Sequence, residues 1–448
     1  MRTYKTSILL ILLVFLGSIS KAQDTLTLSE CIDYALEHHL SIENSIIDEE
    51  AADLDINETR ASGLPQVDGS ADFMASPKIQ SQFVPEDAFS PFGDPDRVVP
   101  LAFGVPFSSD AHVEVTQLLY SNTFFVGLEA AKTYKKLSEQ NTQFTKQDVV
   151  LNVTKAYYGV LVNQHRKELY NANKSQLDKL LSDATVMFDA GMIESIELTK
   201  IQVSINNLIT EIEKVNSLDV VSRNLLKFNM GMALSEPLLL GDSLEGLLSS
   251  SDTASIPGLN PEERLDYQIL QSQLELTDLN VSNEKSRAVP TAVAFGRVGA
   301  NNGAINFEDL PKFGNWESYA FVGIQLNVPI FSSGQKKNRV EKAKLDQVKL
   351  LNQMEQAVSG YELEYSELKE NFKNYLASLE RQQINLDMAQ LVYEDAQIKY
   401  VEGTGTNADI VSAQTSLKEA QVNYLATVYD LLITQVDLDK CTGNLISE

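Results

Sequence analysis

The sequence has few of the side chains on which enzyme and metal sites are built. Its 448 residues include two cysteines, one tryptophan and four histidines, and the histidine spacing matches no metal-ligand motif: His38, His39, His112 and His165. The eight methionines form no cluster of the kind that binds soft metals. We also find no nucleophile–base set and no phosphate-binding loop. The sequence therefore predicts neither an enzyme nor a protein with a metal or another cofactor.

Basic residues are scarce as well. There are 36 Lys and Arg against 62 Asp and Glu, which gives a net charge of −26. This balance excludes a nucleic-acid-binding surface as the main activity and disfavours contact with anionic lipid through basic patches. An acidic surface could line a water-filled passage and favour cations there, or it could simply keep a large polar surface soluble. The composition leaves both open.

The apolar run at the N-terminus is too short to span a membrane. It covers the nine residues Ile8–Leu16, whereas a transmembrane helix takes about 20. Basic Arg2 and Lys5 precede it and the small-x-small triplet Ser20-Lys21-Ala22 follows, which indicates a signal peptide over 1–22 and an exported protein. No cysteine follows closely enough for a lipoprotein. Removing three basic residues leaves 33 against 62, a mature charge of −29.

The two cysteines, Cys31 and Cys441, lie near opposite ends of the mature chain. A disulfide between them is permitted in an exported protein and would join the termini. Two separate buried thiols are the commoner outcome in a chain with so few cysteines. The sequence leaves both outcomes open.

One short stretch occurs twice, as Phe188-Asp189-Ala190-Gly191-Met192-Ile193 and as Tyr400-Val401-Glu402-Gly403-Thr404-Gly405-Thr406. In each, a glycine follows an aromatic residue by three positions, and glycine tolerates the left-handed conformation that ends many helices. Apolar residues recur every three or four positions before each stretch, in a pattern typical of a coiled coil. We interpret both stretches as tips of helical hairpins in a duplicated chain.

The two repeats are predicted to share one order of elements, helix, two strands, long helix and return helix. The first repeat covers 23–236, with a helix at 28–64, strands at 66–75 and 112–120, a long helix at 124–188 and a return helix at 194–228. A connector follows at 237–259. The second repeat covers 260–448, with a helix at 261–287, strands at 291–299 and 319–330, a long helix at 335–400 and a return helix at 407–440.

The sequence also makes predictions for the segment between the first two strands and for the start of the last strand. Residues 76–110 contain six prolines, so we expect a long loop without regular structure. Trp316 and Tyr319 stand at the start of the last strand, where an aromatic residue at a membrane interface would be.

The four strands are long enough to cross a bilayer when tilted, but four strands cannot close a barrel. Open sheet edges are not tolerated in lipid. The barrel would therefore be shared, by two copies with eight strands or by three copies with twelve. Two ordinary soluble hairpins are the alternative.

With these features the chain resembles the TolC family of outer-membrane efflux proteins over essentially its mature length. The resemblance rests on the duplication, on the two tips and on two segments in which a strand passes into a turn, 117–121 and 328–334. The second tip is the most specific, as Tyr400-x-x-Gly403-Thr404-x-Thr406-x-x-Asp409. The resemblance implies a mostly helical fold with a transmembrane β-barrel. A homotrimer would form one twelve-strand barrel in outer-membrane lipid, continuous with a twelve-helix tunnel through the periplasm.

The resemblance also implies partners and site residues at the tips. The positions that match the family's docking tips, where a periplasmic membrane-fusion (adaptor) protein binds and recruits an inner-membrane pump, are Gly191, Met192, Gly403 and Thr404. Glu197 and Asp409 each follow a tip glycine by six residues, and they match the inward carboxylates of the family's periplasmic constriction. Tyr400 matches the aromatic residue of its lock. Gly405 and Ser412 stand where the family has Arg and Asp, so the lock does not carry over intact.

The function that the resemblance implies is a passive exit duct of a tripartite efflux system. We expect drugs or other small molecules delivered by an RND-type (resistance–nodulation–division) pump. An exit duct for type I protein secretion with an ABC transporter is the alternative, followed by a non-conducting periplasmic coiled coil. The lack of Met and His clusters argues against a dedicated copper or silver duct.

Overall fold

The computed structural model describes residues 25–88, 91–244, 246–247 and 256–445. The predicted signal peptide and part of the predicted connector lie outside these residues. The chain divides into two compact units. We call them the helical unit, made of Met1–Asp48, Ser138–Leu270 and Gln353–Glu448, and the sheet unit, made of Glu49–Leu137 and Gln271–Asn352.

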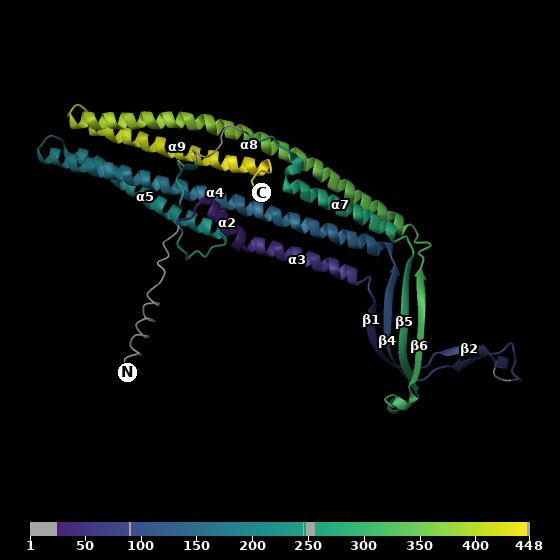
Figure 1. The fold of residues 1–448 in the computed structure, drawn as a ribbon. Coiled ribbons are helices and arrows are strands. Elements are labelled where there is room, and N and C mark those ends of the chain that lie inside the picture. Colours follow the sequence, from purple (N-terminus) through teal and green to yellow (C-terminus); the bar gives the residue numbers. More distant parts are fainter. Residues whose placement is uncertain (1–24, 89–90, 245, 248–255, 446–448) are drawn as a thin grey trace, which may run out of the picture. The chain divides into compact units, whose positions relative to one another are not determined.

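The sheet unit contains a four-stranded antiparallel sheet in the order β1-β4-β5-β6 (Figure 1). Its strands are β1 (Gln66–Ala75), β4 (Phe107–Tyr120), β5 (Thr291–Ala304) and β6 (Glu317–Asn327). In the part of the chain that the structure describes, β1 and β6 each pair with one neighbour only. Both outer strands therefore leave one edge unpaired.

The register gives this sheet one face without charge. We call it the apolar face; it carries Val67, Phe73, Val113, Val115, Val298, Val322, Ile324 and Leu326, together with small and neutral residues. The four strands contain seven Asp, Glu, Arg and His residues, and all of them lie on the other side, the polar face: Asp68, Asp72, Asp110, His112, Glu114, Arg297 and Glu317. Alternation along each strand produces this separation, because successive side chains point to opposite faces.

The bounds of the later strands differ from the prediction. We expected a strand to end at residue 299, but β5 continues to Ala304. A Cβ on Gly299 would lie 2.6 Å from His112 Cβ and 2.8 Å from the Tyr319 hydroxyl, so this glycine permits close approach within the sheet instead of ending the strand. The last strand ends at Asn327 and not at residue 330, since Pro329 has no N–H to donate.

Tyr319, near the start of the last strand, lies on the polar face and not on the apolar face. It pairs with Gly299 on the polar face, and its hydroxyl donates to Asp110 Oδ2 at 2.7 Å. Three aromatic rings cluster near the end of β1. The ring of Phe307 lies 5.8 Å from that of Phe73 and 5.9 Å from that of Phe107, measured between centroids. Phe73 and Phe107 belong to the apolar face.

The prediction of an irregular loop at 76–110 was also wrong. Strands β2 (Ser81–Pro85) and β3 (Val98–Ala102) pair as a second antiparallel hairpin, and β4 begins at Phe107. The prolines are tolerated because a two-stranded hairpin consists of edge strands, which need no complete ladder of hydrogen bonds. Phe83 and Phe92 are exposed on this segment.

The helical unit is built from two helical hairpins and the start of the chain (Figure 1). The helices that lie wholly or partly in it are α2 (Leu28–His38), α3 (Leu40–Ala61), α4 (Asn122–Asp189), α5 (Ser195–Met230), α7 (Leu265–Ser286), α8 (Gln335–Val401) and α9 (Asn407–Cys441). The long and return helices agree with the predicted ranges within two residues at each end. In the part of the chain that the structure describes, no helix has the length and apolar character needed to cross a membrane.

The first helix is interrupted, where we had predicted a continuous one over 28–64. His39 has an extended backbone with φ −77° and ψ 120°, which separates α2 from α3. The turn at Gly231 packs against this break, since a Cβ there would lie 2.8 Å from His38 O and 3.0 Å from His39 Cα. A contact with a residue almost 200 positions away is invisible to local sequence patterns.

The two cysteines are free thiols, so the structure does not contain the disulfide that the sequence left open. Cys31 packs with Ala35, Val153 and Tyr157 in one hydrophobic cluster. Cys441 lies elsewhere, with its Sγ 3.3 Å from Arg264 Nη1. Separate burial, which the sequence also allowed, is what the fold produces.

Candidate functional site at the helical tips

The turn between α4 and α5 is closed by its own backbone. Gly191 N–H donates to Phe188 O and Met192 N–H to Met187 O, both at 2.8 Å. Gly191 has φ +73° and open space around its Cα. This is a Schellman motif, which satisfies the last carbonyls of a helix and needs a left-handed residue. Met192 is 74% exposed, so the turn presents an apolar side chain at its surface.

The turn between α8 and α9 repeats this arrangement. Gly403 has φ +74°, and the Thr404 N–H donates to Lys399 O at 2.9 Å. Gly405 lies close to the helix end, because a Cβ there would be 3.0 Å from Lys399 Cβ. A side chain at position 405, where the resembling family has Arg, would therefore require a local shift. All four residues that we predicted to dock a partner lie at the two turns.

Glu197 is held by Lys200 of its own helix, α5, and by Asn407 at the start of α9. Its Oε1 accepts from Lys200 Nζ at 2.8 Å, and its backbone carbonyl accepts from Asn407 Nδ2 at 2.8 Å. The Lys200 bond, with help from Asn407 and against the effect of burial, holds the pKa of Glu197 below its usual value. Glu197 Oε2 is buried and has no hydrogen-bond partner.

Asn407 is a site residue that the sequence analysis missed. It is 2% exposed and links the start of α9 to the start of α5. Its Oδ1 is a further buried atom without a hydrogen-bond partner. The only signal in the sequence is an amide directly after the helix-capping Thr406, which many helices carry without any such contact.

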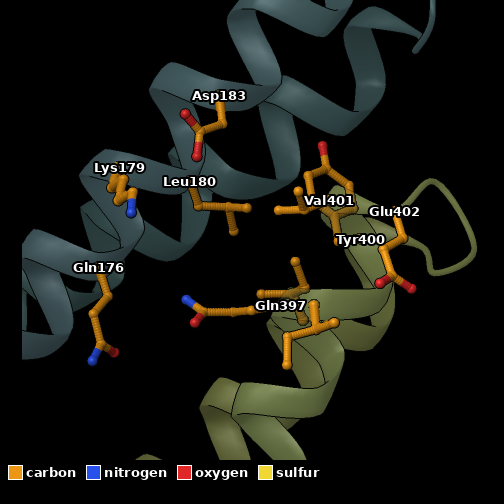
Figure 2. Close-up of a pocket in the computed structure, with 10 residues that line it drawn as sticks. Gln176, Lys179, Leu180, Asp183, Gln397, Tyr400, Val401 and Glu402 are labelled. Carbon is orange, nitrogen blue, oxygen red and sulfur yellow. The ribbon is translucent and has the colours of Figure 1, made fainter.

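Tyr400 borders a pocket of 460 Å³ between the ends of α4 and α8. Figure 2 shows Leu180 of α4 pointing toward Tyr400 and Val401 at the end of α8, and Asp183 and Glu402 also line the pocket. Tyr400 is 6% exposed and its hydroxyl has no hydrogen-bond partner. Burial, with the negative charges of Glu197 and Asp183, raises the pKa of this hydroxyl. It is therefore neutral at physiological pH.

Asp409 forms the cap of its own helix. Its Oδ2 accepts from the Thr406 N–H at 2.9 Å and from the Thr406 hydroxyl at 2.7 Å, while the Asp409 N–H donates to the Thr406 hydroxyl. These bonds lower the pKa of Asp409. The carboxylate thus stabilises the start of α9 whatever else it contacts.

One group in the described residues could hold a metal ion, and it lies in the sheet unit, away from the tips in the sequence. Asp72, Asp110 and His112 bring their ligand atoms within 4.8 Å of one another. The sequence analysis found no such spacing, because Asp72 comes from a different strand.

The sequence profile of the outer membrane efflux protein family matches residues 31–231 and 265–444. The chain belongs to this family. The outer membrane protein TolC of Vibrio cholerae is 22% identical over 438 residues, which cover 96% of this chain and 93% of that protein. Its Escherichia coli K12 counterpart is 21% identical over 447 residues, which cover 96% and 84%.

Solved structures share the fold of this family member. The similarity to CusC has a TM-score of 0.74 at 14% identity and covers 95% of both chains. The similarity to the open state of the MtrE outer membrane channel of Neisseria gonorrhoeae has a TM-score of 0.71 at 17% identity, covering 96% of this chain and 94% of that one.

Membership places this protein in the outer membrane as an efflux duct of the TolC family, and not among enzymes. Efflux ducts of this kind act with adaptor proteins and inner-membrane pumps. The predicted family and the predicted absence of enzyme activity are therefore confirmed.

Proposed function

We propose that three copies of the chain form one duct, with a shared barrel of twelve strands in the outer membrane. The observation that carries this proposal is the sheet, which combines an uncharged exposed face with two unpaired edges. Lipid requires every backbone N–H and C=O to be paired, so an open sheet has to close with other copies. Three copies of four strands give twelve.

The strand lengths and faces support the same assembly. The four strands have 10 to 14 residues, and about 9–11 suffice for a tilted crossing. The apolar face would meet lipid and the polar face would line water, as in outer-membrane barrels. The phenylalanines around Phe107 would then lie near one membrane surface, where aromatic residues collect.

The helical hairpins would continue this barrel as a periplasmic tunnel. We place the adaptor at the tips, on Gly191, Met192, Gly403 and Thr404, and the periplasmic constriction at Glu197, Asp409 and Tyr400. Glu197 supports this role, because it lies where the two turns of one chain meet. Three copies would bring several carboxylates together and favour cations.

The cargo that we propose is drugs or other small molecules from an RND-type pump. Type I protein secretion with an ABC transporter is the second candidate. We also propose that residues 1–22 are removed on export and that no lipid anchor is attached, since no cysteine follows the apolar run closely.

Single-channel conductance of the purified protein in planar bilayers tests the duct and its constriction. We expect a small, cation-selective conductance, and we expect the Glu197→Ala, Asp409→Ala double variant to increase it or lose selectivity. The matched control is Glu211→Ala with Glu30→Ala. Glu211 has the same kind of ion pair, with Lys214 at 3.0 Å, and Glu30 the same capping role at Thr27, but neither lies at a tip.

The outcomes separate the parts of the proposal. A large conductance that both double variants leave unchanged would keep the duct but remove the acidic constriction. An absence of channels from well-folded, membrane-inserted protein would overturn the duct itself.

A further inference from the structure

Two carboxylates oppose each other on the polar face of the sheet. Asp72 of β1 pairs directly with Asp110 of β4 in the antiparallel register. Like charges at directly opposite positions destabilise a sheet. The hydroxyl of Ser70 donates to Asp72 Oδ2 at 3.2 Å, but no Lys or Arg of the described residues forms an ion pair with Asp72. A positive charge bound between the two carboxylates would therefore offset their repulsion.

An imidazole completes a set of three ligands. His112 follows Asp110 by two positions on the same strand, so both side chains share the polar face. His112 Nδ1 lies 2.5 Å from Asp110 Oδ1, and the donor atoms of all three residues lie within 4.8 Å of one another. The side chains of His112 and Asp110 are only 12% and 31% exposed.

The surrounding residues orient these ligands. The Tyr319 hydroxyl donates to Asp110 Oδ2 at 2.7 Å, which leaves Oδ1 toward His112. Tyr319 and His112 approach each other across β5 because Gly299 between them has no Cβ. Arg297, the nearby cation, is ion-paired with Glu114. Hydrogen bonds of this kind to ligating carboxylates fix the geometry of metal sites.

We propose that Asp72, Asp110 and His112 form a binding site for one divalent cation of the zinc class. One imidazole and two carboxylates suit Zn²⁺, whose bonds to nitrogen and oxygen are about 2.1 Å and whose tetrahedral ligand atoms are about 3.4 Å apart. Small side-chain rotations bring donors within 4.8 Å to that spacing. The cation would bind Nδ1 in the place now taken by the Asp110 Oδ1 contact, with the ring proton of a neutral imidazole on Nε2.

The site has room on its open side. A pocket of 420 Å³ is bordered by Asp72 and Asp110 together with Ser108 and Asn301. Water there supplies the fourth ligand. The proposal does not depend on the duct, because every ligand comes from β1 and β4 of one chain.

Cobalt binding to the full-length protein in detergent tests the site. Co²⁺ reports coordination through its visible absorption, and Zn²⁺ is then added as the competitor. We expect one Co²⁺ per chain, displaced by Zn²⁺. Asp72→Asn and His112→Gln should each weaken Co²⁺ binding by a factor of about ten or more. Asp68→Asn is the matched control, since Asp68 lies on the same strand and face opposite Glu114, and it should leave binding unchanged.

Two results overturn the site, namely no saturable Co²⁺ binding to the wild type, or equal binding to wild type and Asp72→Asn. Asp72 is exposed, so this isosteric variant is expected to fold even if His112→Gln does not. A failure of cobalt binding with normal channel conductance leaves the proposed duct standing. Normal cobalt binding by a protein that forms no channels would overturn the proposed duct and leave the metal site standing.

Discussion

Each thiol of this protein is protected by its own surroundings. Burial raises the pKa of Cys31 to about 12, and burial together with Glu364 raises the pKa of Cys441. A raised pKa keeps a thiol protonated at pH 8, and the thiolate is the reactive form. We therefore expect neither cysteine to react with an aromatic disulfide reagent in the folded protein. Two equivalents should react after denaturation, and one fast equivalent in the native state would contradict this burial.

Glu197 makes the stability of the tips dependent on pH. Its pKa is lowered in the folded protein, mainly by Lys200, so ionised Glu197 stabilises the fold above the unfolded pKa of about 4.3. That contribution is lost as the pH falls through the folded value. We expect Glu197→Gln to lower the thermal midpoint at pH 7.5, by less than about 1 kcal/mol in stability, and to have no effect at the lowest tolerated pH. Glu213→Gln, on the same helix, is the control.

At the scale of the element, the start of α9 depends on its capping box. Thr406 and Asp409 satisfy each other's backbone N–H groups. We expect Thr406→Ala to cost about 1 kcal/mol and to speed hydrogen exchange over the first turn of α9. Thr415→Ala is the control, since the Thr415 hydroxyl bonds only the Val411 carbonyl of the same helix. Equal exchange in both variants would show that the cap contributes nothing.

The two faces of β6 can be tested with neighbouring residues. Ile324 belongs to the apolar face and Gln325 to the polar face, and both are exposed. A lysine on a lipid-facing position costs about 2–4 kcal/mol near the bilayer centre. We expect Ile324→Lys to reduce assembly in the outer membrane and Gln325→Lys to be tolerated, as measured by heat-resistant oligomer on gels. The reverse order would mean that the faces are assigned the wrong way round.

For the whole molecule, the unpaired edges of β1 and β6 predict an oligomer and no stable monomer in membranes. We expect multi-angle light scattering of the detergent-solubilised protein to give a protein mass of three chains, after correction for bound detergent. Two chains would give eight strands and a different barrel. A monomer with a folded sheet would contradict closure between copies, because its edges would face lipid unpaired.

Much of the fold could be predicted because its signals are local. The absence of proline between Pro106 and Pro237 allows the long helix α4, and the two glycines at 191 and 403 mark its end and that of α8. Alternation along the strands gives their approximate positions. The predicted bounds of the first helix and of β5 were wrong because contacts with distant residues decide them. His39 packs against Gly231, and Gly299 lies between His112 and Tyr319.

The site at the tips was predicted from a resemblance, and only part of it follows from the residues themselves. The positions of Gly191 and Gly403 follow from the helix ends. The cap formed by Asp409 could have been read from Thr406 three residues earlier, a capping-box spacing. The bond from Asn407 to Glu197 joins residues 210 positions apart, so no local pattern contains it.

The sequence by itself determined the acidic charge, which depends on composition alone. It also determined the long and return helices, the two turns and the strand alternation, because each depends on neighbours a few positions away. The tertiary structure decided the strand register, and with it the faces on which Tyr319 and the charged residues lie. It alone brought Asp72 to Asp110 and His112, and Asn407 to Glu197. These choices depend on which distant backbone segments pair and pack, and the same alternating pattern is compatible with more than one register.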